Sequence, residues 1–464
     1  MNIVPDLLER FPAGRPALLE ISRDGERRVW HFGELIAQSA GLSGAFAARG
    51  VRRGEVVMTL VGNRVEWVLA MLACWRMGAV AMPCSTQLRR GDVEARAGQA
   101  NPVLCVGEEE LLGELPAGIE ALSMADVSAV LDEDEPQETP GSVAELGPAD
   151  PALVIFTSGT TGQPRGALHG HGYLPGQALQ AEHWLGARKG ELAWCTAAPG
   201  WSKSSRNSFL APWLRGAAAL LHDARFEPAE RLEICRREGV NLLCQAPTEY
   251  RMLAKRTEVG ELPEMRRMLS AGEALDAEVI GHFRERVGVE IADGYGQTET
   301  GAMTGWGPGA RVVPGSMGRP LPGIETRVAE GELQLRAASS PTFFLGYLDA
   351  PGPPELVDDE WWATGDFVRA DDRGLYWYEG RGDDLIASSG YRIGPDEVES
   401  ALCSHPDVAE AAAIGVPDAE RGQVVKAFVV LRSGEPSSEL AAELQRHARG
   451  ETAPYKAPRR VEFV

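Results

Sequence analysis

Short runs of apolar residues alternate along the chain with longer stretches in which apolar and polar positions are mixed. The runs 55–61 and 240–245 have the length of buried strands. The stretches that follow them, 66–77 and 250–256, have the length and amphipathic character of helices. Strands that alternate with helices in this way are typical of βαβ units and largely parallel sheets. The pattern therefore predicts an α/β protein whose large N-terminal domain contains several such units and more than one sheet.

Two stretches divide the chain. Residues 131–150 are acidic, contain proline and have few large apolar residues, so we expect an exposed connection there. The sequence GRGDD at 380–384 precedes a shorter α+β pattern, made up of a helix at 395–405, a strand at 424–431, a helix at 438–449 and a strand from 460. We predict a large domain over residues 1–380, a hinge at 381–383 and a small mobile domain over 384–464.

Composition narrows the class of protein. The 464 residues carry a formal net charge of −21, which disfavours nucleic acid and anionic lipid as partners. Apolar runs such as 217–221 are too short to span a bilayer, and the first residues do not have the basic and apolar character of a signal segment. The 7 cysteines include no CxxC pair. We expect reduced thiols in a cytoplasmic enzyme, with neither a disulfide frame nor a cysteine metal site.

Residues 157–165, TSGTTGQPR, follow the buried apolar run 153–156 directly. Glycines let backbone amides converge on an anion, and hydroxyl groups add further donors, so this loop is suited to phosphate oxygens. The pattern GxxxxGK[ST] of ordinary nucleotide hydrolases occurs nowhere in the chain. The loop therefore predicts nucleotide binding of a different kind.

This loop resembles the phosphate-binding loop of the adenylate-forming superfamily, which includes acyl-CoA synthetases, luciferases and peptide-synthetase adenylation domains. Further matches follow in the order of that family, namely DGYGQTET at 293–300, TGD at 364–366, GRGDD at 380–384 and SSGYRIGP at 388–395. The likeness covers essentially the whole chain. It is strongest to medium-chain acyl-CoA synthetases, through the segments 200–217, 388–395 and 454–464.

The resemblance implies roles for the residues around ATP. Tyr295 would offer its ring to adenine, Asp293 would accept from the adenine amino group, Thr298 would donate to the α-phosphate and Glu299 would bind Mg²⁺. The resemblance assigns to the ATP/AMP site Thr157, Ser158, Gly159, Thr160, Thr161, Gly162, Gln163, Pro164, Arg165, Gly272, Glu273, Asp293, Gly294, Tyr295, Gly296, Gln297, Thr298, Asp366 and Arg381.

The remaining matches concern ribose, the hinge and coenzyme A. Asp366 and Arg381 resemble the ribose contacts, Asp383 takes the position of the hinge, and Arg392 is a cation that would face the acyl phosphate. The likeness also implies a set of contacts to CoA, in which the first three residues line the pantetheine tunnel: Ser389, Gly390, Tyr391, Gln87, Arg421, Tyr455 and Lys456.

The resemblance also implies that three positions bound the acyl pocket, Trp201, Lys203 and Gly296. Amino-acid adenylating relatives place an aspartate where this chain has Lys203, a cation that would repel a substrate ammonium group. Short-chain relatives close the pocket with a tryptophan where this chain has Gly296. We therefore expect a medium-chain or aryl acid to be preferred over acetate, and the Gly296→Trp substitution to shift the preference toward shorter acids.

Two departures from the family pattern stand out. Arg165 occupies a position where many members have lysine, which keeps the charge. The family's adenylation step also uses a lysine about a dozen residues beyond the stretch 454–464, and the sequence ends at Val464. Lys456 belongs to the upstream motif. We expect the small domain to be truncated before that lysine and adenylation by this chain to be slow.

The predicted function is a carboxylic acid–CoA ligase that uses ATP, CoA and Mg²⁺ and forms an acyl-AMP intermediate without a covalent acyl-enzyme. Its partners would be a small carboxylic acid, ATP and CoA, with neither nucleic acid nor a membrane-embedded segment. Three alternatives stay open, a stand-alone adenylating enzyme, a luciferase-like oxidase and a non-catalytic binding relative. The oligomeric state, a homodimer included, stays open as well.

Overall fold

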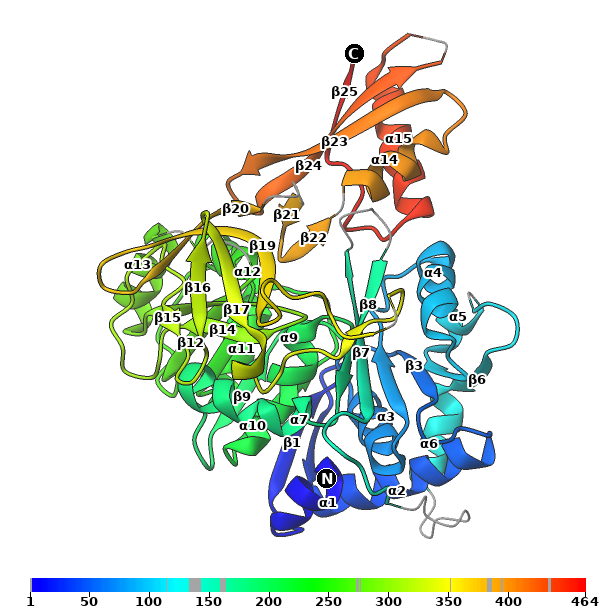
Figure 1. The fold of residues 1–464 in the computed structure, drawn as a ribbon, viewed down its shortest axis with the longest axis vertical. Coiled ribbons are helices and arrows are strands. Elements are labelled where there is room, and N and C mark those ends of the chain that lie inside the picture. The colour runs from blue at the N-terminus through cyan, green and yellow to red at the C-terminus, as the bar shows by residue number, and fades with distance from the viewer. Residues whose placement is uncertain are drawn as a thin grey trace.

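The computed structural model describes residues 2–113, 115–132, 143–158, 164–272, 275, 277–350, 352–381, 386–393, 395–432 and 435–464. Figure 1 shows a large body that contains the N-terminus and a small domain above it that contains the C-terminus. The large body is built on three sheets and the small domain on one. This architecture confirms the predicted α/β class, with a multi-sheet N-terminal part and a small α+β part.

The first sheet has nine strands in the order β15-β14-β13-β12-β11-β9-β10-β1-β2. Its six central strands, β13 to β1 in that order, are parallel, and its three outer strands are antiparallel to their neighbours. The strands are β1 Pro16–Ile21, β2 Arg27–His31, β9 Leu192–Cys195, β10 Ala218–His222, β11 Leu242–Gln245, β12 Arg267–Ala271, β13 Ile291–Gln297, β14 Gly301–Gly305 and β15 Arg319–Pro320.

The second sheet has seven strands in the order β18-β8-β7-β4-β3-β5-β6, with parallel pairing from β7 to β6. The strands β7 and β8 form an antiparallel hairpin around the predicted phosphate loop. The strands are β3 Val56–Leu60, β4 Val80–Pro83, β5 Leu104–Gly107, β6 Glu120–Ser123, β7 Pro151–Ser158, β8 Pro164–Gly170 and β18 Gly346–Tyr347.

The structure contains two further sheets. A four-stranded antiparallel sheet, which the sequence pattern did not predict, consists of β16 Thr326–Ala329, β17 Glu332–Arg336, β19 Trp361–Ala370 and β20 Tyr376–Arg381. The small domain contains β21 Ile386–Ser388, β22 Tyr391–Ile393, β23 Val408–Asp418, β24 Gly422–Leu431 and β25 Arg460–Phe463. The predicted hinge lies between β20 and β21, and residues 382–385, with Asp383, are outside the described residues.

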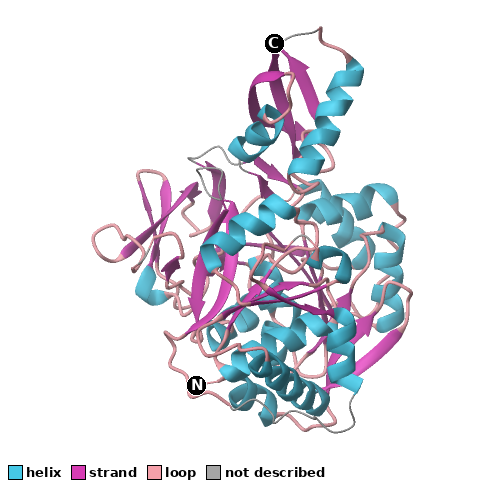
Figure 2. Cartoon of the chain, turned by 90° about the vertical axis from the view of Figure 1, so that its right-hand side faces the viewer, coloured by secondary structure: helices cyan, strands magenta, loops and turns pink. Residues whose placement is uncertain are grey.

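Helices cover the sheets, as the view in Figure 2 shows. The α-helices are α1 Ile3–Leu7, α2 Phe32–Ala48, α3 Val65–Met77, α4 Arg90–Ala100, α5 Glu109–Leu112, α6 Met124–Asp132, α7 Tyr173–Gly176, α8 Ala178–Gln180, α9 Ser202–Ser205, α10 Ala211–Leu214, α11 Pro228–Glu238, α12 Pro247–Arg256, α13 Ala277–Val287, α14 Pro395–Cys403 and α15 Ser438–Glu451. Short turns of other helix types are η1 Leu8–Arg10, η4 Ala337–Ser339 and the π-helical η2 Ala181–Leu185 and η3 Arg206–Leu210. In the described part of the chain, no helix is long and apolar enough to span a bilayer.

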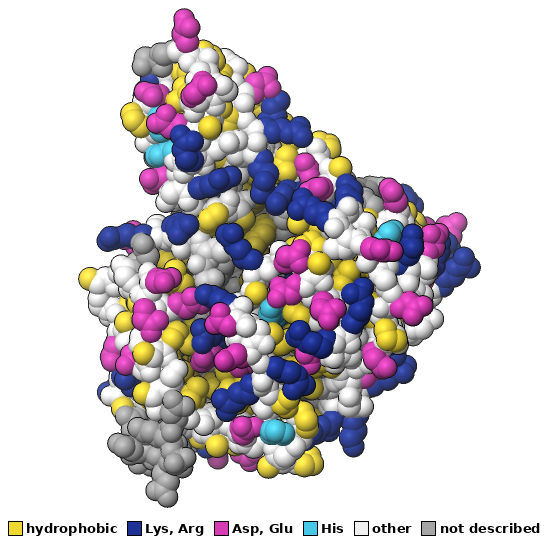
Figure 3. All heavy atoms as spheres, turned by 180° about the vertical axis from the view of Figure 1, so that it is seen from behind, with side chains coloured by type: hydrophobic (Ala, Val, Ile, Leu, Met, Phe, Trp, Pro, Cys, Tyr) yellow, Lys and Arg dark blue, Asp and Glu magenta, His cyan; other side chains and the backbone are white. Residues whose placement is uncertain are grey.

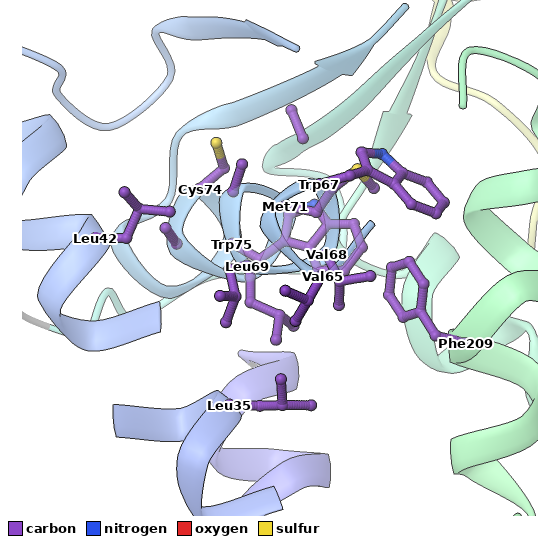
Figure 4. Packing of buried hydrophobic residues seen from close by; sticks show 14 of the residues in the cluster. Leu35, Leu42, Val65, Trp67, Val68, Leu69, Met71, Cys74, Trp75 and Phe209 are labelled. Carbon is purple, nitrogen blue, oxygen red and sulfur yellow. The ribbon is translucent and has the colours of Figure 1, made fainter. Parts of the chain in front are cut away.

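Helix α3 lies in the middle of the largest core cluster. Figure 4 shows its side chains in contact with α2 and with Phe209 of η3. Trp67 and Trp75 of α3 are both fully buried, as are nearly all of its other residues. The expectation of an amphipathic helix here was wrong, because α3 packs between elements on all its faces, as helices that are apolar all round do. The connection 131–150 is also not wholly exposed, since Leu146 is buried.

Candidate active site

The DGYGQ part of the central motif forms β13, near one edge of the parallel strands of the nine-stranded sheet. A strand covered on both faces buries its side chains, and Asp293 and Tyr295 are each 8% exposed. Close approach explains the two glycines. A Cβ atom on Gly294 would lie 2.5 Å from the Trp184 indole nitrogen, and one on Gly296 would lie 1.9 Å from the Gly301 carbonyl oxygen.

The second of these distances corrects the interpretation of Gly296. A side chain at that position would be directed into the backbone of β14 and not into open space. Glycine at position 296 therefore does not open the acyl pocket by removing an indole ring. Glycine is needed at this position because strands β13 and β14 approach each other closely.

Asp366 of β19 and the side chains of β13 form one buried hydrogen-bonded group. The Tyr295 hydroxyl donates to Asp366 Oδ2 over 2.5 Å, and Gln297 Nε2 donates to the same oxygen over 2.7 Å. The Tyr378 hydroxyl lies 3.4 Å from Asp366 Oδ1. Trp362 Nε1 holds the Gln297 amide in place through a bond of 3.1 Å to its oxygen. The two predicted nucleotide contacts Tyr295 and Asp366 are thus brought together, although they are far apart in sequence.

Thr298 and Glu299 follow β13 in the turn that leads to β14. The Thr300 hydroxyl closes this turn by accepting from the Gln297 backbone amide over 3.0 Å. Glu299 is 9% exposed, and its Oε1 accepts from the Tyr347 hydroxyl over 2.7 Å. A carboxylate oriented in this way is a hard oxygen donor of the kind that Mg²⁺ takes together with phosphate oxygens. The described residues contain no group of three or more potential ligands that would hold a metal without a substrate.

Arg165 closes the predicted phosphate loop. Its backbone pairs with Thr157 across the β7–β8 hairpin, so the ends of the loop are held together. Its guanidinium forms a bidentate ion pair with Asp349 at 2.9 and 3.0 Å and lies 3.7 Å from the centre of the Tyr347 ring. Hydrogen bonding to Asp349 raises the pKa of Arg165. The expected phosphate cation is therefore held beside Tyr347, the same side chain that orients Glu299.

A cavity of about 970 Å³ lies between the large body and the small domain. Figure 3 shows the hollow between the two parts, with Lys and Arg side chains around it. Trp201 and Lys203 of the large body line the cavity, together with Ser389, Gly390 and Tyr391 of the small domain. The two predicted segments, for the acyl group and for pantetheine, thus lie on opposite walls of one cavity.

Aromatic rings join these two walls. The Tyr391 and Tyr455 rings stack with centroids 4.0 Å apart, and the Trp201 ring meets Tyr391 edge-on at 5.1 Å. Burial raises the pKa of the Tyr391 hydroxyl to about 12, so this group stays a neutral donor. Gln87 lies near the Tyr391 hydroxyl and lines the same cavity. Gln87, Tyr391 and Tyr455 therefore lie next to one another, as the three predicted contacts to CoA should.

The loop between β21 and β22 keeps its shape through Arg421. The Arg421 guanidinium donates to the Ser389 hydroxyl over 2.9 Å, and the Ser389 amide donates to the Arg421 carbonyl over 3.2 Å. Ser389 has a φ of 53° and Gly390 a φ of 77°, so this loop passes through two left-handed residues in succession. Arg421 also lines the cavity. Arg421 fixes the backbone of this loop and places a positive charge at the cavity at the same time.

Lys456 has a different neighbour from the one expected. Its ammonium lies 3.1 Å from Asp92 Oδ1 in α4, and Lys456 is 3% exposed. It therefore connects the small domain to the large body, whereas the resemblance implied a contact with CoA. Sequence alone gave no signal for Asp92, nor for Asp349 and Tyr347, because each acts through a partner that is distant along the chain.

Several predicted site residues cannot be placed. Outside the described residues lie Gly159, Thr160, Thr161, Gly162, Gln163, Glu273 and Asp383. The side chains of Ser158, Arg381 and Arg392 are also outside the description.

Gly272, directly after β12, lies close to Lys203. Gly272 has a φ of 104°, and a Cβ atom on it would lie 2.6 Å from the Lys203 ammonium. That ammonium donates to the Ala271 carbonyl over 2.7 Å, so Lys203 is directed toward the segment after β12.

Two cysteines next to Lys203 were not predicted as part of the site. Cys195 of β9 and Cys244 of β11 are partners in the parallel register, both are buried, and both line the cavity. The neighbouring Cys195 thiol and burial raise the pKa of Cys244. All seven cysteines are free in the structure, and six of them are buried.

Comparison with known proteins agrees with this geometry. The model of the AMP-binding enzyme family matches residues 6–342, and that of the AMP-binding enzyme C-terminal domain matches residues 397–464. An uncharacterized acyl-CoA ligase of Bacillus subtilis, YtcI, is 35% identical over 100% of this chain and 92% of its own length. Human mitochondrial acyl-coenzyme A synthetase ACSM3 is 33% identical over 100% of this chain and 86% of its own. An acyl-CoA synthetase of Brucella canis has a similar crystal structure, with a TM-score of 0.73, 31% identity, and coverage of 100% and 90% of the two chains.

Proposed function

We propose that this chain, which belongs to the family of AMP-binding enzymes, ligates a carboxylic acid to coenzyme A through an acyl-adenylate. The acyl-CoA synthetases and ligases among its relatives support this reaction. The observation that carries the proposal is the cavity between Trp201 and the Ser389–Tyr391 loop. It gives a thiol arm a route between the two parts of the molecule to the acyl end of the site.

In the first half-reaction a carboxylate oxygen of the acid attacks the α-phosphorus of ATP. A phosphorus–oxygen bond forms, the bond to pyrophosphate breaks, and acyl-AMP results. The work of the protein is alignment and charge neutralisation. Asp366 would accept the ribose hydroxyls, and Tyr295, held by its bond to Asp366, would present its ring to adenine. Thr298 would donate to the α-phosphate.

In the second half-reaction the CoA thiolate attacks the acyl carbon. A carbon–sulfur bond forms, the carbon–oxygen bond to AMP breaks, and the thiol proton leaves to solvent. The stacked Tyr391 and Tyr455 rings, packed against Trp201, would exclude water along this route. Exclusion of water would protect acyl-AMP from hydrolysis. Arg421 keeps the loop in the shape that lets the thiol arm pass.

Magnesium and the size of the acid belong to the same proposal. Glu299, oriented by Tyr347, would hold Mg²⁺, which when bound neutralises charge on the phosphates. The acid would be of medium chain length or aromatic and not acetate, since the cavity extends past Trp201 to Lys203 and Cys195. A cytoplasmic location is the setting that we propose for an enzyme with free cysteines and these substrates.

The test measures both products in one assay. Purified enzyme with MgATP, CoA and a panel of acids should release pyrophosphate and form thioester in equal amounts. Acetate should be a poorer substrate than hexanoate and benzoate. Pyrophosphate release without thioester would favour the stand-alone adenylating enzyme. ATP binding without release of pyrophosphate would favour a non-catalytic relative.

A further inference from the structure

Arg206 is a buried cation at the first position of η3. It is 4% exposed, and its Nε and Nη1 atoms are shielded from solvent and have no hydrogen-bond partner. No ion pair between described residues includes it. Buried guanidinium groups are normally paired with a carboxylate or fully hydrogen-bonded, since an unpaired charge in the interior is strongly unfavourable. Arg206 is therefore missing an acceptor that the described chain does not supply.

The groups around Arg206 do not provide this acceptor. His169 and Tyr173 lie within its electrostatic reach, and both are buried. Burial and the charge of Arg206 lower the pKa of His169 to about 3, so this histidine is neutral. Burial raises the pKa of the Tyr173 hydroxyl, which is neutral as well. The surroundings of Arg206 are polar, but they carry no negative charge.

Arg206 lies near the acyl end of the proposed site, although it is not itself among the residues that line the cavity. It lies three residues after Lys203, and residues three apart in a helical segment share a face. Lys203 lines the cavity, and so does the Cys244 thiol, on which both cations act electrostatically. One more buried donor without a partner, Gln245 Nε2, belongs to a residue that lines the cavity. The acyl end thus contains buried donors that a plain hydrocarbon chain would leave without a partner.

We propose that the acid ligated by this enzyme carries a second carboxylate, distal to the reacting one, and that Arg206 binds it. The inference rests on the proposed function, since it identifies the class of acid. A distal carboxylate supplies the missing acceptor, and the planar guanidinium can hold it through two parallel hydrogen bonds. Lys203 adds a second positive charge at the wall of the cavity. A monocarboxylic acid of equal length would leave the charge of Arg206 unpaired.

The experiment compares dicarboxylic acids with monocarboxylic acids of the same carbon number, from malonate and propanoate up to adipate and hexanoate. Pyrophosphate release and thioester formation are measured on the 464-residue chain. We expect the best dicarboxylic acid to exceed its matched monocarboxylic acid at least tenfold in kcat/KM. Arg206→Met should lower this ratio on the order of 30-fold or more, chiefly through the KM of the dicarboxylic acid. Arg206→Lys should keep part of the preference.

Arg215→Met is the matched control, because Arg215 is nearby in the same stretch of chain but is exposed and paired with Glu182. It should leave the ratio unchanged. If the monocarboxylic acid is better in every pair while thioester is still formed, the inference is wrong and the proposed function stands. If no acid releases pyrophosphate, the proposed function fails and the inference with it. Should Arg206→Met not fold, the wild-type ratio and the Arg206→Lys variant decide between these outcomes.

Discussion

Lys456 and Asp92 form a largely buried ion pair that connects the small domain to the large body. The ammonium nitrogen lies 3.1 Å from Asp92 Oδ1, and the two side chains are 4% and 9% exposed. Asp92 also accepts from the Arg89 amide with its other oxygen, so the carboxylate is fixed at the start of α4. The pair exists only when the small domain faces α4. It therefore stabilises the arrangement in which the Ser389–Tyr391 loop lines the cavity.

The first prediction concerns this arrangement. Removing one partner of a buried pair costs about 3–5 kcal/mol in the state that contains the pair. Asp92→Asn should therefore slow thioester formation from preformed acyl-AMP at least tenfold and leave ATP–pyrophosphate exchange nearly unchanged. Glu94→Gln on the same helix, where Glu94 is exposed and paired with Arg90, is the control. Equal loss of both half-reactions in Asp92→Asn would show that the pair does not distinguish two arrangements.

The second prediction concerns Asp366. This carboxylate is fully buried and accepts from Tyr295 and Gln297, so its position is well defined. Asp366→Asn should raise the KM for ATP by an order of magnitude or more, because an amide cannot accept both ribose hydroxyls with the same geometry. Steady-state kinetics with ATP as the varied substrate measures this. The exposed neighbour Asp372→Asn should have no effect, and an unchanged KM in Asp366→Asn would remove this residue from the nucleotide site.

The third prediction concerns Gly296. A methyl group here would collide with the Gly301 carbonyl, whereas a methyl group on Gly98 in α4 would meet nothing within 4 Å. Gly296→Ala should lower the free energy of unfolding by about 1–3 kcal/mol, as overpacking does. Gly98→Ala should be neutral or stabilising by up to about 1 kcal/mol. Denaturant titration of the two variants provides the comparison. A Gly296→Ala protein as stable as the wild type would restore the interpretation that this position opens into the acyl pocket.

The fourth prediction concerns pH. Burial lowers the pKa of His169 to about 3 and that of His171 to about 4, against 6.5 for an unfolded histidine. Between pH 4 and 6.5 the unfolded chain thus binds protons at these positions that the folded chain does not. Stability should be greatest above pH 6.5 and fall on acidification, by about 1.4 kcal/mol per pH unit for each histidine. His171→Gln should reduce this slope in denaturant titrations at pH 7, 6 and 5. An unchanged slope would show that His171 does not stay neutral in the folded state.

Much of the fold followed from local pattern. The expected strand and helix at 55–61 and 66–77 are β3 and α3, those at 240–245 and 250–256 are β11 and α12, and the small domain has the predicted elements. Local pattern succeeded here because burial on a sheet and periodicity on a helix are written into neighbouring residues. It did not reveal the antiparallel sheet of β16, β17, β19 and β20, whose strands are partly exposed and carry a mixed pattern.

The motifs by themselves determined the class of chemistry. Within each motif, for phosphate, adenine or a thiol arm, the residues follow one another directly in the sequence. Only the tertiary structure decided how these residues are held. It paired Arg165 with Asp349, Glu299 with Tyr347 and Lys456 with Asp92. It also placed the charge of Arg206 in the interior. Such relationships join residues tens to hundreds of positions apart, and they depend on how sheets and domains pack, for which neighbouring residues carry no signal.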